Sequence, residues 1–498
     1  MKKTLTQYGL YVLLIPIFFV LHGYNQNFGL IGFTDCLLLL TTYCAAVSVL
    51  YLLAKLFFKN AQKAALLTGL LISFYLFFGA LFDFFKVHVA FLSRYSVILP
   101  VFFIAACLLL VFLKRSKNNF NRLTLFLNTL LLVYLLWDGA AIVWKLGHPN
   151  PDKLSIYDEG SKTNYQPCTD CKNPDIYFLV FDEYSSTVAL QQTFNYDNSE
   201  LDSFLSQRGF SNQLHSHSNY NFTPFSMASI LNMNYIKGIK NIDACSVEDY
   251  ANCNNLIRNN EVIRLLSSKQ YDIVNYSIFD LAGNPSIIET SLLPVKTRLL
   301  TAQTFYHRVM HDIGWNLLVG RFEIKWLSKN LLYENLNNNN KILTLVKRES
   351  NLHTAHPRFV YAHFEMPHPP FYYDKNLRLR SEEQLASEKT GDYIQSYKDY
   401  IPYTNSKIKE IIDTIQKNTG DAAVIILMGD HGYRVDVNPT SHSHYFKNLN
   451  AVYFPNKNYQ QLTGSVNGVN QFRVIFNSLF KQSLPLLPDS TIFLRDQP

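Results

Sequence analysis

A pentapeptide late in the chain carries the residue types best suited to chemistry: residues 428–432 read Met-Gly-Asp-His-Gly. They follow an apolar run, 421–427, that predicts a buried strand. Asp430 and His431 should therefore emerge at the carboxyl end of a strand, where open α/β sheets hold ligands. An adjacent carboxylate and imidazole can bind a divalent cation, and flanking glycines let backbone approach closely. The structural alternative is a turn in which Asp430 bonds its own backbone.

Two further clusters fall at predicted strand ends or helix starts. Asp182 and Glu183 directly follow the apolar run 175–181, so their carboxylates should lie at the sheet edge, where hard cations find oxygen ligands. Thr223 and Pro224 have the sequence of an N-cap and the first residue of a helix. A hydroxyl there is placed to attack phosphorus while free backbone N–H groups hold phosphate oxygens. The plain alternatives are a polar strand end and an ordinary helix start.

Four histidines complete the set of candidate site residues. His363 ends a predicted strand, and His368 lies in a loop stiffened by neighbouring prolines, which suits a metal ligand or a phosphate-binding imidazole. His442 and His444 follow the Asp-His pair closely in sequence. The alternative for each of the four is a solvent-exposed histidine without a site role.

Alternating strands and helices must position these residues. The predicted strands cover 175–181, 271–276, 357–363, 421–427 and 449–454, and the predicted helices cover 201–207, 261–270 and 401–417. Strands alternating with helices imply an α/β/α sandwich with a mostly parallel sheet. A run of asparagines, 337–340, predicts a loop or a helix terminus.

The first third of the chain is far more apolar than the rest. Five apolar stretches, each near the ~20 residues that a helix needs to cross a bilayer, occupy Tyr8–Tyr24, Cys36–Phe58, Ala64–Phe85, Tyr95–Leu113 and Leu123–Val143. The fold class predicted is therefore an N-terminal bundle of about five transmembrane helices followed by an α/β domain. The expected boundaries are 1–146 for the bundle, 147–174 for a linker and 175–498 for the domain.

Basic residues predict the orientation of the bundle. They cluster before the first stretch, between the second and third, and before the fifth, at Lys2, Lys3, Lys55, Lys59, Lys63, Lys114, Arg115, Lys117 and Arg122. These segments should be cytoplasmic. The domain after the fifth helix should then lie outside the cytoplasm, in the periplasm, anchored to the cell inner (cytoplasmic) membrane by several passes.

Charge and cysteine usage narrow the function classes. The net charge of +7 sums the membrane-flanking groups and a mixed surface without a basic stripe, so we expect no nucleic-acid partner. Of the seven cysteines, four lie outside the apolar stretches: Cys168, Cys171, Cys245 and Cys253. In an oxidising compartment their even number favours disulfides over a zinc site, with the pairing left open.

In this order the segments resemble the alkaline phosphatase superfamily, specifically its sulfatase-like branch, which includes lipoteichoic acid synthases and lipid A phosphoethanolamine transferases. The segments that carry the likeness are Asp182 after the first strand, residues 218–235 around Thr223, the Pro-His368-Pro-Pro-Phe loop, residues 429–432 and residues 446–454. Five apolar stretches ahead of the domain are also similar to those enzymes.

The resemblance implies a ligand set. In that family the first acidic residue, the catalytic Thr and the Asp-His pair bind one divalent ion, here Zn²⁺ or Mn²⁺ given the imidazole. Carried over, the set is Asp182, Thr223, Asp430 and His431, with Glu183 as an extra ligand. His368 resembles the histidine near a second ion or the transferred group, and His363, His442 and His444 match less closely.

One departure from the family pattern bears on the reaction. Sulfatases begin their formylglycine signal with Cys or Ser, one residue, then Pro, whereas Pro224 directly follows Thr223 here and the nearby Arg is missing. The resemblance thus implies transfer of a phosphoethanolamine or phosphoglycerol group through a phospho-threonine, from a phospholipid donor to an envelope glycan or lipid acceptor. The alternatives are a phosphodiesterase or phosphatase that ends in water, and a non-catalytic envelope sensor or binding protein.

Overall fold

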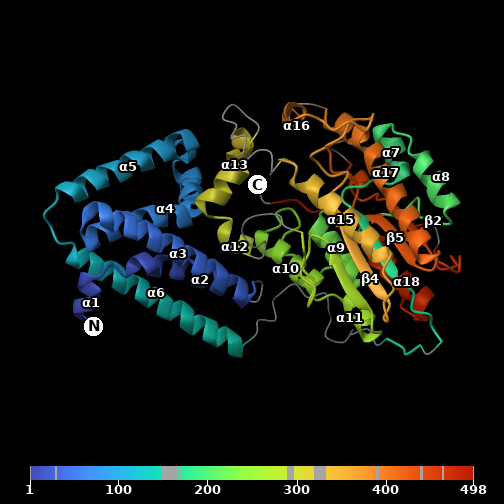
Figure 1. Ribbon diagram of the computed structural model, residues 1–498, viewed down its shortest axis with the longest axis horizontal. Coiled ribbons are helices and arrows are strands. Elements are labelled where there is room, and N and C mark those ends of the chain that lie inside the picture. The colour runs from blue at the N-terminus through green and yellow to red at the C-terminus, as the bar shows by residue number, and fades with distance from the viewer. Residues whose placement is uncertain are drawn as a thin grey trace. The chain divides into compact units, whose positions relative to one another are not determined.

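The computed structural model comprises two compact units (Figure 1). It describes residues 2–28, 31–148, 165–168, 170–288, 297–318, 332–387, 392–437, 441–462 and 465–496. One unit contains Met1–Pro151 and Ser291–Leu317, and the other contains Asp152–Thr290 and Leu318–Pro498. Most of the predicted linker, 147–174, lies outside the described residues, and its boundaries stay a prediction.

The first unit is built from apolar helices. A short α1 (Lys2–Gln7) precedes α2 (Tyr11–Gln26), α3 (Phe33–Phe58), α4 (Ala61–His88), α5 (Tyr95–Arg115) and α6 (Asn121–Gly147). Helices α2 to α6 confirm the predicted apolar bundle. The last four are long and apolar enough to cross a membrane, whereas α2 has 16 residues, a length of about 24 Å.

A segment distant in sequence completes this unit. Helices α12 (Arg298–Thr301) and α13 (Phe305–Leu318) belong to it, although residues 291–317 fall inside the range predicted for the α/β domain. Helix α4 departs from helical geometry at Phe77, and two residues later the N–H of Gly79 donates to Gln303 O at 2.7 Å. Arg308 of α13 also pairs with Asp83 of α4.

The second unit surrounds a six-stranded sheet in the order β2-β6-β5-β1-β4-β3. Its strands are β1 (Ile176–Phe181), β2 (Ser211–Asn212), β3 (Asp272–Tyr276), β4 (Arg358–Phe364), β5 (Val424–Gly429) and β6 (Asn450–Tyr453). Strands β3, β4, β1 and β5 run parallel, and β6 and β2 add antiparallel pairs at one edge. The predicted α/β class with a mostly parallel sheet is confirmed.

Helices cover both faces of this sheet (Figure 1). Helices α9 (Thr223–Asn232), α11 (Glu261–Ser268) and α18 (Gln471–Phe480) share a buried apolar cluster with alternate residues of β1, among them Phe178 and Val180. On the opposite face, α15 (Glu334–Ser350) packs against β3, β4 and α17 (Tyr393–Thr419). Among the described residues of the unit, further α-helices are α7 (Thr187–Phe194), α8 (Ser199–Gln207), α10 (Val247–Arg258) and α16 (Glu382–Ser387).

The cysteines outside the first unit divide into two kinds. Cys168 and Cys171 form a disulfide, as the sequence favours. Cys245 and Cys253 are buried free thiols, so the expectation of a second disulfide is wrong. Both pack into the apolar cluster beneath α9, where a thiol behaves as a small hydrophobic side chain.

Candidate active site

The register of three parallel strands brings two acidic residues together. Phe181 at the end of β1 pairs with Gly429 of β5 on one side and Phe364 of β4 on the other, so all three strands end at one level. The next residues, Asp182 and Asp430, therefore emerge side by side, as the strand-end argument predicts. Asp182 is 6% exposed and Asp430 is fully buried.

Asp430 is held in a fixed orientation by the backbone. Its Oδ1 accepts the N–H groups of Glu183 at 3.0 Å and His431 at 2.9 Å. Its Oδ2 is buried without a hydrogen-bond partner and lies 3.2 Å from His431 Nε2. Oδ1 thus forms the backbone hydrogen bonds of the turn that the sequence allows, and Oδ2 remains available for a ligand.

His431 presents one ring nitrogen to the site. Its Nδ1 lies 2.9 Å from Gly432 O, so this nitrogen carries the proton and donates it. Burial lowers the pKa of His431 below its usual value, which keeps the imidazole neutral. The lone pair of Nε2 therefore points toward the two aspartates.

The donor atoms fit a metal ion. One ligand atom each from Asp182, Asp430 and His431 all lie within 4.8 Å of one another. Asp182 Oδ1, like Asp430 Oδ2, is buried without a hydrogen-bond partner, an arrangement that is costly unless a cation occupies the space between them. Carboxylate oxygens with a neutral imidazole are the donor set of divalent transition metals, so these three residues form a candidate metal site.

Thr223 joins this site as the first residue of α9. The prediction that Thr223 caps the helix is wrong, because Phe222 occupies the N-cap position and no side chain caps the helix. The hydroxyl turns instead toward the metal site, with Oγ1 3.1 Å from His431 Nε2. Ser226, one turn later, donates its hydroxyl to Asp430 O at 2.6 Å and ties α9 to the loop after β5.

Glu183 lies beside the metal site but has its own partner. Its φ of 60° turns the chain after β1, and its Oε1 accepts from Arg434 Nε at 2.7 Å. Its carboxylate is outside the group formed by Asp182, Asp430 and His431. The role of Glu183 as an extra ligand stays a prediction, and Arg434 is a cation of the site that the sequence argument missed.

Strand β4 and the loop that follows it carry the next two histidines, His363 in the strand and His368 in the loop. His363 is fully buried, and its Nε2 has no hydrogen-bond partner while its Nδ1 lies 3.1 Å from Tyr361 OH. Burial lowers the pKa of His363 to about 4, so it is neutral. His368 has its Nδ1 2.7 Å from Pro369 O. Their roles with substrate or a second ion stay predictions.

An asparagine missed by the sequence argument positions this loop. Asn339 lies within α15, although its asparagine run predicted a loop or a helix terminus. Its carboxamide accepts from Glu365 N at 2.8 Å and donates to Glu365 O at 3.1 Å. Asn339 is buried and forms hydrogen bonds with both backbone groups of Glu365. These bonds explain why an asparagine run, which is unfavourable in a helix, is helical here.

The last two histidines lie apart from the metal group. His444 Nε2 is 2.8 Å from Val435 O, and burial lowers the pKa of its imidazole. His442 stacks on Phe493 with 4.3 Å between ring centroids. His442 and His368 both line an open cleft of about 650 Å³ that also contains Glu183 and Arg434. The metal or substrate roles of His442 and His444 stay predictions.

Close backbone contacts explain one glycine of the pentapeptide. A Cβ on Gly432 would lie 2.2 Å from His444 O and 2.8 Å from Lys447 O. We expect Gly432→Ala to lower the free energy of unfolding by ~3 kcal/mol, because backbone rather than a flexible side chain must move. The measurement is thermal unfolding in detergent, with Gly139→Ala as the control, since nothing lies within 4 Å of its added Cβ. Equal unfolding midpoints for the two variants would contradict the prediction.

Comparison with known proteins agrees with the predicted resemblance. A family model described as Sulfatase matches residues 198–467, a segment that contains Thr223, Asp430 and His431. No curated protein matches the chain.

Several solved structures are similar to the chain. The C-terminal periplasmic domain of EcEptC from Escherichia coli, in complex with Zn, is 10% identical with a TM-score of 0.41, covering 67% of this chain and 92% of that one. The C-terminal periplasmic domain of phosphoethanolamine transferase EptC from Campylobacter jejuni is 12% identical with a TM-score of 0.37, covering 64% and 92%. The phosphonate monoester hydrolase of Agrobacterium radiobacter is 12% identical with a TM-score of 0.38, covering 62% and 74%.

Proposed function

The chain belongs to the sulfatase family, whose model matches more than half of its length, and from this premise we propose that it is a membrane-anchored phosphoryl-group transferase. The transferred group is a phospholipid head group of the phosphoethanolamine or phosphoglycerol type, and the acceptor is an envelope glycan or lipid. The observation that carries the proposal is the position of Thr223, whose Oγ1 lies 3.1 Å from His431 Nε2 at the metal site.

The residues around Thr223 support nucleophilic attack on phosphorus. When bound, Zn²⁺ or Mn²⁺ would lower the pKa of the Thr223 hydroxyl and neutralise charge on phosphoryl oxygens. Asp182, Asp430 and His431 would hold that ion. The free backbone N–H groups in the first turn of α9, to which Pro224 contributes none, would bind phosphate oxygens. Arg434, on the wall of the adjoining cleft, adds a fixed positive charge.

The proposed reaction balances in two half-reactions. In the first, a Thr223 Oγ–P bond forms as the bond between phosphorus and the glyceride oxygen breaks. Thr223 loses its hydroxyl proton and the departing diacylglycerol gains one. In the second, an acceptor hydroxyl attacks phosphorus, the Oγ–P bond breaks, and Thr223 regains a proton as the acceptor hydroxyl loses one.

The apolar unit fits a lipid donor. Four of its helices are long and apolar enough to cross a membrane, and the basic residues flanking them favour a catalytic domain outside the cytoplasm. We place the protein in the cytoplasmic membrane as a multi-pass enzyme with an extracytoplasmic domain. Tethering there raises the effective concentration of the site near donors in the bilayer.

Intact mass spectrometry of the purified full-length protein tests this proposal. After incubation with total envelope phospholipids we expect a covalent adduct whose mass names the head group, and its loss when an envelope glycan fraction is added. The control sample is incubated with a chelator. Loss of the adduct in buffer alone at the same rate would favour the hydrolase alternative, and no adduct with no consumption of phospholipid would overturn the proposal.

A further inference from the structure

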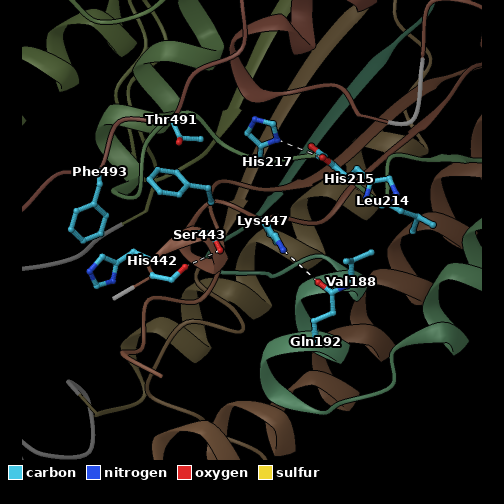
Figure 2. A pocket seen from close by; sticks show the side chains of 13 residues that line it. Val188, Gln192, Leu214, His215, His217, His442, Ser443, Lys447, Thr491 and Phe493 are labelled. Atoms are coloured by element: carbon cyan, nitrogen blue, oxygen red, sulfur yellow. Dashed lines mark hydrogen bonds between the residues drawn. The ribbon is translucent and has the colours of Figure 1, made fainter. Parts of the chain in front are cut away.

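A second pocket opens beside the cleft of the candidate active site. It has a volume of about 720 Å³ and lies among α7, the segment 214–217, the segment 441–447 and the C-terminal residues 491–493 (Figure 2). His442 and Phe493 line both this pocket and the cleft. These two stacked rings form a shared wall, so the pocket and the cleft adjoin at His442 and Phe493.

The charges lining the pocket favour an anion. No Asp or Glu is among its lining residues, whereas Lys447 and three histidines are. Two of these histidines already face carboxylates, His217 Nε2 with Asp489 at 2.7 Å and His442 Nδ1 with Asp436 at 3.6 Å, so Lys447 carries the argument for an anion. Lys447 Nζ lies 3.5 Å from the carboxamide oxygen of Gln192 on α7 (Figure 2). Among the described residues, no ion pair of Lys447 with a carboxylate is found. The lysine charge is thus left without a counterion in a concave site, where it is worth more than on an open surface.

The rest of the lining fits a sugar ring. Ser441, Ser443 and Thr491 present hydroxyl groups, and Gln192 presents a carboxamide, which can bond to sugar hydroxyls. The face of the Phe493 ring that is not stacked on His442 offers an apolar surface for the C–H face of a sugar. The volume is within the range of small-molecule sites, and apolar walls with a few converging polar groups are typical of them.

The pocket is also built onto the metal loop. The carbonyl groups of His444 and Lys447, in its 441–447 segment, contact Gly432, and Gly432 N donates to Tyr445 O at 2.8 Å. The position of Lys447 is therefore tied to that of His431, so an occupant of the pocket is held at a defined place relative to Thr223.

We propose that this pocket binds the acceptor of the transfer, and that the acceptor is a saccharide bearing an anionic group. Lys447 binds the anion, and the hydroxyls and Phe493 hold the ring. The attacking hydroxyl of the acceptor passes the His442–Phe493 wall into the cleft. This inference rests on the proposed transferase function for its catalytic role, but the anionic-sugar site stands on the pocket alone.

A Lys447→Gln variant tests the site by binding and by turnover. With glucose 6-phosphate as the probe, titrated calorimetrically into Thr223→Ala protein, we expect Lys447→Gln to weaken binding ~10-fold. Lys447→Arg should restore most of the affinity because it keeps the charge. Binding of neutral glucose should be the same with and without Lys447→Gln.

In the turnover experiment, Lys447→Gln in the otherwise wild-type chain should form the Thr223 adduct from envelope phospholipids. We expect its discharge to the glycan fraction to be ~10-fold slower than in wild type. The matched control is Lys341→Gln, an exposed lysine of α15 whose Nζ donates to Ile287 O at 2.9 Å. Discharge in the control should equal that of wild type.

The outcomes separate this inference from the proposed function. Unchanged binding of glucose 6-phosphate by Lys447→Gln would overturn the anionic site. Weakened binding with unchanged discharge would overturn its assignment to the acceptor. If wild type forms no adduct while probe binding still depends on Lys447, the transferase proposal fails and the anionic-sugar site is upheld.

Discussion

Replacing Thr223 by Ala should abolish the covalent adduct and reduce turnover of phospholipid by at least ~10³-fold, about 4 kcal/mol of transition-state stabilisation. The reason is that its hydroxyl is the group at the metal site placed to form a bond to phosphorus, with Oγ1 3.1 Å from His431 Nε2. Because this hydroxyl caps no helix N–H, the loss should come from chemistry rather than from unfolding. Intact mass and head-group release are the measurements.

Two controls make the Thr223 result interpretable. Thr223→Ser keeps a hydroxyl at the start of α9 and should keep measurable adduct formation. Thr344→Ala removes an exposed hydroxyl of α15 that donates to Asn340 O, and it should behave as wild type. An adduct of the same mass on Thr223→Ala would contradict the role of Thr223 and require another nucleophile.

Local strand-end reasoning predicted much of the candidate site. Asp182 and Asp430 follow apolar runs, and parallel strands end at one edge of a sheet. To predict that the two residues lie side by side, only the order of the strands in the sheet was needed in addition. His431 came with Asp430 as its neighbour. For Thr223 the sequence located the helix start to within one residue but not the direction of the hydroxyl, which depends on a contact with a residue 208 positions away in sequence.

The residues that were missed depend on long-range packing. Arg434 reaches Glu183 only because the chain turns back after β5, and no periodicity marks it. Asn339 pairs with Glu365 across the interface of α15 and β4, so its helical position overrides a weak local propensity. The grouping of residues 291–317 with the apolar unit rests on partners such as Asp83 and Arg308, far apart in sequence.

Removing the metal should destabilise the α/β unit. Asp182→Asn should make the metal-free protein more stable than metal-free wild type, but the variant should no longer bind the metal. Burial, reinforced by the neighbouring Asp430, raises the pKa of Asp182 well above its usual range. A folded-state pKa above the unfolded value means that stability present at low pH is lost as the pH rises through the folded-state pKa. Without a cation, the Asp182 carboxyl therefore lowers the free energy of unfolding at neutral pH relative to acidic pH.

We expect metal at 1,000 times its dissociation constant to stabilise the wild-type protein by about 4 kcal/mol. Metal-free Asp182→Asn should be ~1–3 kcal/mol more stable than metal-free wild type and show no shift of its unfolding midpoint with metal. Thermal unfolding between pH 5 and 8, with and without Zn²⁺ or Mn²⁺, measures both effects.

The control is Asp413→Asn, which removes an exposed carboxylate paired with Arg208 and should keep the full metal response. If metal stabilised Asp182→Asn as much as it stabilises wild type, Asp182 would not be a ligand. The stabilisation expected for a ligand depends on attraction between its negative charge and the cation.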